Sequence, residues 1–228
     1  MDNAPDNARG RPLEDRHGNA PVTAALLADM VAAGRITDPA TPRGRLLRAA
    51  ARLFRQKGYA RTTVRDLAAE IGILSGSIFH HFPNKEAILF AVMAEVVVAM
   101  TAGLKLRLET AAPTSRAQLR ALIHNELAFI HGEEAGDATA VLVHEWRSLS
   151  EPLQRDIMSM RAAYEAYWLN IFQAASDEGH LVGEPAIVRQ LLHGGLTWTV
   201  YWYRPDGRVD LDALTNQALA MVYRDGPG

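Results

Sequence analysis

The segment from residue 43 to residue 93 constrains the fold more than any other part of the chain. Apolar residues recur at helical spacing between Arg45 and Lys57, while arginines lie on the opposite face of the same stretch. This spacing predicts an amphipathic helix, and Gly58, directly after a lysine, is typical of a helix end.

Two shorter helices are expected immediately downstream. A threonine hydroxyl at 62–63 can accept from the free amides of a first helical turn, and Asp66 follows as a weaker form of the capping box. This helix would end near Glu70, Gly72 would supply a tight turn, and the next helix would run from about Leu74 to His81. Two short helices joined by a glycine-containing turn form a helix-turn-helix.

The charge of this segment favours contact with nucleic acid. Residues 43–90 contain nine Lys and Arg against three Asp and Glu, a net charge of +6, whereas the whole chain carries −2 and the remainder therefore −8. Neutralisation of phosphates by Lys and Arg supplies most of the non-specific affinity for DNA. Charge alone would fit a basic solvated surface equally well, but the turn pattern beside it favours DNA binding.

The same residues resemble the TetR family of transcriptional regulators. The matching motif consists of Thr62-Thr63-Val64-Arg65-Asp66-Leu67-Ala68, Gly72-Ile73, Gly76-Ser77-Ile78-Phe79-His80-His81-Phe82 and Asn84-Lys85-Glu86. A less extensive similarity links the C-terminal part to the TetR sub-group of acyl-CoA-responsive repressors of lipid and steroid catabolism. It is carried by Glu145-Trp146-Arg147, Thr197-Trp198 and Tyr201-Trp202-Tyr203-Arg204-Pro205-Asp206-Gly207.

An all-α fold follows from the helical patterns and from this resemblance. The resemblance implies a three-helix helix-turn-helix DNA-binding domain at 41–90 and a helical ligand-binding and dimerisation domain at 91–228, about nine helices in all. Residues 1–40 are expected to form a flexible arm, disordered over the first 20 residues, with a possible helix from Val22 to Ala33. Packing of this helix on the body of the protein is favoured over an arm that touches DNA. The remaining helices are expected from Lys85 to about Thr110, from a Ser115 and Gln118 capping box, from Ala138 to Leu149 after a loop at 132–137, from Glu151 to Asp177, from Glu184 or Pro185 to Tyr203, and from an Asp210 cap to Tyr223.

The resemblance also implies which residues contact DNA. Small residues at the start of the recognition helix let its backbone approach the groove, and Lys85, at the next helix N-terminus, would contact a phosphate. Leu74 stands where a serine cap is common, so the cap either moves to Ser75 or is missing. Phe79 stands where tyrosine is common, and simple packing is an equal alternative for it. The expected contacts are Arg43, Arg45, Thr62, Thr63, Ser75, Gly76, Ser77, Phe79, His80, His81 and Lys85.

A ligand pocket between the middle helices is a further implication of the resemblance. Arg147 and Arg161 could bind the phosphates of an acyl-CoA, although surface ion pairs explain them equally well, and a smaller aromatic or lipophilic ligand fits the same residues. Aromatic residues at helical spacing also form cores and interfaces. The candidate pocket residues are Phe129, His144, Trp146, Arg147, Met158, Arg161, Tyr164, Trp168, His193 and Trp198.

The last two helices are expected to pair with their copies across a two-fold axis. Half-site geometry requires such a dimer, because two recognition helices must reach successive major grooves about 34 Å apart. The candidate interface residues are Gly194, Gly195, Trp202, Tyr203, Leu211, Leu214 and Leu219.

Together with these patterns, the resemblance implies a homodimeric transcriptional repressor that binds a palindromic operator and releases it when a small molecule binds. Activation is the alternative, because the sign depends on where the operator lies. No cofactor and no metal are expected: cysteine is absent, and His80 and His81 lack a further ligand at suitable spacing. No catalytic arrangement is recognisable, so an enzyme is not expected. The polar N-terminus and the charges that interrupt the apolar stretch 87–108 favour a soluble, cytoplasmic protein.

Overall fold

The computed structural model describes residues 20–133 and 135–224, so the disorder expected of residues 1–19 falls outside it. Within the described residues the chain is all-α, as predicted, with no strand beyond an isolated bridge between Leu181 and Tyr223. The helices are α1 (Ala20–Ala32), α2 (Pro42–Lys57), α3 (Val64–Glu70), α4 (Ser75–Ile78), α5 (Lys85–Thr110), α6 (Ser115–His131), α7 (Gly136–Glu145), α8 (Glu151–Asp177), α9 (Pro185–Trp198) and α10 (Leu211–Val222), with short 3-10 helices η2 (Trp146–Ser148) and η3 (Thr199–Tyr201).

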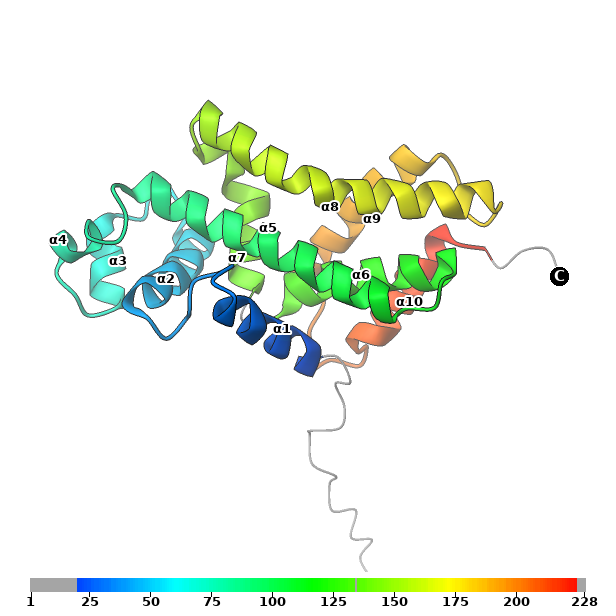
Figure 1. Cartoon of the computed structure of the whole chain (residues 1–228), viewed down its shortest axis with the longest axis horizontal. Coiled ribbons are helices and arrows are strands. Elements are labelled where there is room, and N and C mark those ends of the chain that lie inside the picture. Colours follow the sequence, from blue (N-terminus) through cyan, green and yellow to red (C-terminus); the bar gives the residue numbers. More distant parts are fainter. Residues whose placement is uncertain (1–19, 134, 225–228) are drawn as a thin grey trace, which may run out of the picture.

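Helix α5 is the central helix of the molecule. It starts beside the DNA-binding end, where it packs against α2, and runs along α6 and α8; α9 packs against α8 and α6, and α10 against α6 (Figure 1). By length and composition α5 could cross a membrane, but 61% of its most apolar stretch is buried inside the protein. Its apolar residues belong to one continuous core that also includes α2, so the predicted domain boundary at residue 90 falls within a packed helix.

Local capping signals position several helices as the sequence indicates. The Thr63 hydroxyl accepts from the Asp66 amide at 3.1 Å while the Asp66 carboxylate accepts from the Thr63 amide at 2.8 Å, which confirms the capping box. The side chains of Asn84 and Asp210 cap α5 and α10. Each of these caps satisfies amides of a first turn that have no partner within the helix.

Other expected helix ends were wrong. The cap of α6 is Thr114, whose hydroxyl accepts from the Ala117 amide, because Ser115 is buried and donates to Glu178 instead. Helix α7 begins two residues earlier than predicted and gives way to η2 after Glu145, and α9 similarly gives way to η3.

The recognition helix α4 is shorter than predicted. Beyond Ile78, the amides of Phe79, His80 and His81 bond carbonyls three residues back, so the chain continues as tight turns. Pro83 prevents these turns from continuing as a helix through Phe82, because a proline disfavours helical backbone in the residue before it.

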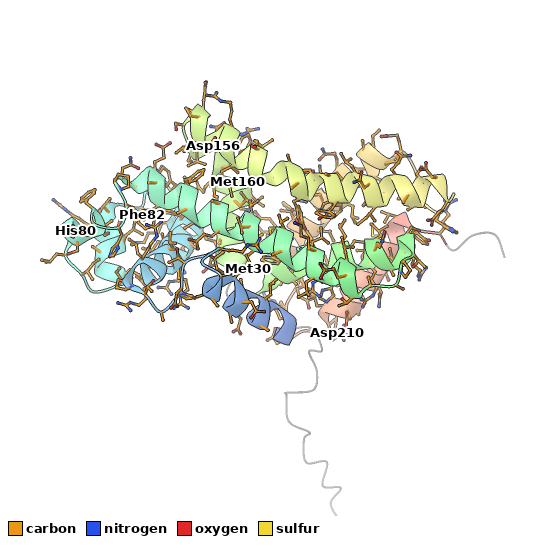
Figure 2. All side chains as sticks on the ribbon, in the orientation of Figure 1. Met30, His80, Phe82, Asp156, Met160 and Asp210 are labelled. Atoms are coloured by element: carbon orange, nitrogen blue, oxygen red, sulfur yellow. The ribbon has the colours of Figure 1, made fainter. Side chains whose placement is uncertain are left out.

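Helix α1 packs on the body of the protein, as expected of an extra helix. Its Met30 is buried against the middle of the molecule (Figure 2), and Leu26 lies beside Gly103 of α5. Farther along, the Thr37 hydroxyl donates to Glu95 of α5 at 2.6 Å, which fixes the chain between α1 and α2.

Candidate DNA-binding surface and ligand pocket

Helix α4 and the turns that follow it to Phe82, called the recognition segment below, form one extreme end of the molecule, with His80 at its tip (Figure 2). Ile78 and Phe82 are buried and anchor the segment, whereas Gly76 is exposed and Ser75 and Ser77 are half-buried. A Cβ added at Gly76 would meet no atom within 4 Å. The fold therefore does not require glycine here, which fits a position where a backbone must approach another molecule closely.

The two departures from the family pattern are both solvent-exposed. Leu74 is the N-cap of α4 without any side-chain cap, so of the two alternatives the cap is missing, and its side chain is 80% exposed. Phe79 is 55% exposed, which argues against simple packing as its role. Two large apolar side chains thus flank the recognition helix on its outer surface.

Arg43 and Arg45 differ in how far contacts within the protein occupy their guanidinium groups. The Arg43 guanidinium donates to the His81 carbonyl at 2.7 Å and lies 3.9 Å from the centre of the Phe82 ring. Arg43 therefore holds the end of the recognition segment. Arg45 is exposed and, among the described residues, donates only to the carbonyl of Ala40, at 2.8 Å, which leaves its other donors accessible to a phosphate.

The expected contact through Thr62 needs correction. Its side chain is fully buried, and its hydroxyl donates to the Gly58 carbonyl at 2.9 Å, so it closes the turn after α2 and does not reach DNA. The Thr63 hydroxyl is exposed but donates to the Asp66 carboxylate at 2.8 Å. Hydrogen bonds from the Thr63 backbone and side chain lower the pKa of Asp66, so that carboxylate stays ionised.

Lys85 is directed into the protein, contrary to its predicted phosphate contact. Its Nζ donates to the carbonyls of Tyr59 and Thr62 at 2.9 and 2.8 Å and lies 4.1 Å from the centre of the Tyr59 ring. Partial burial lowers the pKa of Lys85, an effect that the charge of Glu145 opposes. Lys85 thus ties the start of α5 to the turn between α2 and α3.

A pocket lies between α5, α6, α7, α8 and α9. It holds about 460 Å³ of space, part of which is open to solvent. Four of the predicted ligand residues line it: Arg161, Tyr164, Trp168 and His193. The other lining residues were not predicted and are Val97, Met100, Glu126, Thr139, Leu142, Val143, Glu165 and Arg189.

A buried carboxylate forms part of the pocket wall. Glu126 accepts from the Tyr164 hydroxyl at 2.6 Å, and its other oxygen lies 3.2 Å from Nδ1 of His193. Burial alone would raise the pKa of Glu126, but the hydrogen bonds and charges of His193, Tyr164 and Arg161 together lower it. Burial and the adjacent Glu126 raise the pKa of Tyr164, so its hydroxyl keeps its proton and acts as a donor. Glu126 was visible in the sequence as a charged residue on the apolar face of its helix.

A second carboxylate, the half-buried Glu165, also lines the pocket. Glu165 pairs with Arg189 across the α8–α9 contact and with Arg161 one turn earlier on α8. Arg189 is only 8% exposed, and its Nε has no hydrogen-bond partner. Because Glu165 already pairs with both arginines, a ligand anion would have to compete with it for them.

The remaining predicted ligand residues lie elsewhere. Phe129 is in the core beside Gly103, and His144, Arg147 and Met158 are exposed. Trp146 is half-buried next to Arg147, outside the pocket lining. Trp198 is 63% exposed, whereas Trp168, which lines the pocket, is 1% exposed. These expectations fail because helical spacing defines the faces of a helix but not which face meets the pocket.

Helix α9, the 3-10 helix η3 and the next residue, Trp202, expose a row of apolar and small residues. This row, called the α9 face below, consists of Ile187, Leu191, Gly194, Gly195, Trp198, Tyr201 and Trp202. A Cβ at either glycine would meet no atom within 4 Å of the same protomer. Packing within the protomer therefore does not require glycine at these positions. Close approach of a helix from a second protomer would require it.

Three predicted interface residues belong to the protomer core. Tyr203 is buried and its ring centre lies 4.5 Å from that of His131, while Leu214 and Leu219 are buried on the inner side of α10. Leu211 is half-buried against the core. Of α10, the outward-facing residues include Met221, which is 70% exposed.

Comparison with known proteins gives a consistent assignment. Residues 46–92 match the family described as bacterial regulatory proteins, tetR family, and residues 112–225 match the tetracyclin repressor-like C-terminal domain. The HTH-type transcriptional repressor KstR2 of Mycolicibacterium smegmatis is 31% identical over 82% of this chain and 91% of its own length.

Solved structures agree with this fold. The structure titled superantigen pfit is 44% identical, with a TM-score of 0.74 over 89% of this chain and 100% of that one. AibR in complex with isovaleryl coenzyme A and operator DNA is 23% identical, with a TM-score of 0.71 over 79% of this chain and 97% of that one. The chain therefore belongs to the TetR family of bacterial transcriptional regulators.

Proposed function

We propose that this regulator is a cytoplasmic homodimeric repressor that binds a palindromic operator and releases it when an acyl-CoA thioester enters the pocket. Its 31% identical relative is named a transcriptional repressor, and the similar fold of AibR has been solved with both an acyl-CoA and operator DNA. In this proposal the ligand binds best to a state whose recognition helices are wrongly spaced for the operator, and this differential affinity drives release.

The observation that carries the proposal is the position of α7. Its Thr139, Leu142 and Val143 line the pocket, and its two ends hold the DNA-binding end of the molecule. At one end Asp137 pairs with Arg55 of α2 at 2.7 Å. At the other end the Glu145 carboxylate accepts from the Tyr59 amide, in the turn after α2, at 3.1 Å. A ligand that displaces α7 therefore acts directly on α2 and on the turn before α3.

Dimerisation is supported by the α9 face. Exposed Trp198 and Trp202 beside two glycines form an apolar surface, of the kind that marks interaction sites. Two copies joined through this face present two recognition segments, as two half-sites in successive major grooves require.

The pocket also supports an alternative ligand class. Arg147 lies outside it, and Arg161 and Arg189 are already paired with Glu165, which leaves few free cations for the phosphates of CoA. An aromatic or lipophilic effector without phosphates is therefore the second candidate, and it leaves the DNA-binding part of the proposal unchanged.

Operator selection followed by effector titration tests the proposal. Duplexes enriched from a random pool by the full-length dimer serve as the fluorescent operator. We expect one or more acyl-CoA thioesters, but neither CoA nor the free acids, to weaken operator binding about tenfold or more, which corresponds to a coupling free energy of about 1.4 kcal/mol.

Two variants test whether the response to the thioester arises from the pocket. Arg189→Gln, in the pocket, should abolish the response to the thioester, whereas Arg147→Gln, exposed outside it, should retain the response. Failure to enrich any duplex would refute the DNA-binding part. An enriched operator that no thioester releases would refute the acyl-CoA part and lead to tests of aromatic effectors.

A further inference from the structure

The pocket wall contains an anion that is almost completely removed from water. Glu126 is 3% exposed, and within the part of the chain that the structure describes its two carboxylate oxygens face two donors, the Tyr164 hydroxyl at 2.6 Å and His193 Nδ1 at 3.2 Å. Two carboxylate oxygens together offer about four acceptor positions. Glu126 therefore has unused acceptor capacity beside a cavity, and with 3% of its surface exposed it has little access to water.

A buried donor without a partner lines the same pocket. The guanidinium of Arg189 is paired with Glu165 through Nη2, but its Nε is buried and forms no hydrogen bond. An unsatisfied buried polar group costs about 1 to 3 kcal/mol, and more when it is charged. The pocket thus presents a free acceptor and a free donor to whatever enters it, although apolar side chains such as Val97 and Leu142 form other parts of its wall.

We propose that the pocket selects hydroxylated acyl ligands, whose hydroxyl donates to Glu126 and whose carbonyl oxygen accepts from Arg189. The inference rests on the proposed effector site and specifies its ligand class. A plain hydrocarbon chain would leave the Glu126 acceptors unsatisfied and remove their remaining access to water. A chain that ends in a carboxylate would place a second negative charge beside Glu126, whose lowered pKa keeps it ionised.

Calorimetric titration of the full-length protein tests the selection with matched probes. The first series is octanoyl-CoA, 8-hydroxyoctanoyl-CoA and suberyl-CoA, whose acyl chains end in a methyl, a hydroxyl and a carboxylate group. It is repeated with chains of four and six carbons, so that the result does not depend on whether one chain length places the end group beside Glu126. The second series is the corresponding methyl esters, which lack CoA. At the best chain length we expect the hydroxylated probe to bind about tenfold or more tightly than the methyl-terminated one, the size expected for a hydrogen bond to a charged group, and the carboxylate probe to bind most weakly.

Substitution of the carboxylate identifies its role. Glu126→Gln keeps the shape but removes the charge, and it should reduce the preference for the hydroxyl to about threefold or less, because a neutral amide is a weaker acceptor. Arg147→Gln, an exposed residue outside the pocket, should retain the full preference. If Glu126→Gln does not fold, as judged by circular dichroism, the order of the wild-type affinities for the hydroxyl, methyl and carboxylate end groups still tests the proposed selectivity.

The outcomes separate this inference from the proposed function. Equal or tighter binding of the methyl-terminated probe, or an unchanged preference in folded Glu126→Gln, overturns the inference even if thioesters release the operator. A hydroxyl preference among the methyl esters without any thioester binding supports the inference and refutes the acyl-CoA effector. Absence of binding in both series overturns the inference as well.

Discussion

Replacement of Lys85 by methionine distinguishes a structural role from a phosphate contact. The methionine keeps most of the apolar stem but removes the ammonium group. That group donates to the carbonyls of Tyr59 and Thr62 and lies over the Tyr59 ring. The substitution should therefore destabilise the fold, because both carbonyls lose a charged donor.

The size of the effect follows from these contacts. A hydrogen bond from a charged donor contributes about 1.5 to 3 kcal/mol when buried, and a cation over an aromatic ring about 0.5 to 1 kcal/mol at an exposed site. Lys85 is half-buried, so water replaces part of what is lost. We therefore expect a loss of about 2 kcal/mol in the free energy of unfolding and a decrease of about 4 to 8 °C in Tm.

Two assays measure both roles of Lys85. Urea unfolding gives the stability, with Lys105→Met, an exposed lysine on the same helix, as a control expected to change it by about 0.5 kcal/mol or less. Operator affinity at several salt concentrations gives the number of phosphate contacts, and its slope should be unchanged. Wild-type stability together with a salt slope that is lower by about one unit per protomer would refute the structural role and restore the phosphate contact.

Other expectations concern pH, the dimer and DNA. Burial, reinforced by the charges of Arg107 and Arg55 respectively, lowers the pKa of His124 and His131 from 6.5 to about 4. The unfolded chain therefore binds protons first as the pH falls. At pH 5 the more deeply buried His124 should cost about 2 kcal/mol of stability, and the less buried His131 less, because solvent screens its charge; a flat urea midpoint from pH 6.5 to 4 would contradict this. Gly194→Glu should give folded monomers in sedimentation velocity, because its Cβ meets no atom of its own protomer, and a persistent dimer would move the interface elsewhere. Gly76→Leu should leave Tm nearly unchanged but weaken operator binding about tenfold, and full binding would remove Gly76 from the DNA surface.

Signals within a few residues of one another predicted much of the fold. The bounds of α5 and α8 are those expected from the sequence, since a cap, a proline in the first turn and a glycine past the end all act locally. The Thr63 capping box and the family motif are equally local. The predicted capping of α6 by Ser115 was wrong because of a contact far away in the sequence. Ser115 has a hydroxyl suited to capping, but that hydroxyl donates to Glu178.

The tertiary structure alone decided which face of each helix meets which neighbour. The sequence marks Trp168 and Trp198 as similar amphipathic residues, yet Trp168 lines the pocket and Trp198 lies on the open α9 face. Lys85 likewise has the position of a phosphate ligand, but the turn after α2 brings two carbonyls within its reach. Periodicity fixes which residues share a helix face, because that depends on residues three and four apart. The rotation and contacts of that face depend on packing between segments far apart in the chain, which no local pattern encodes.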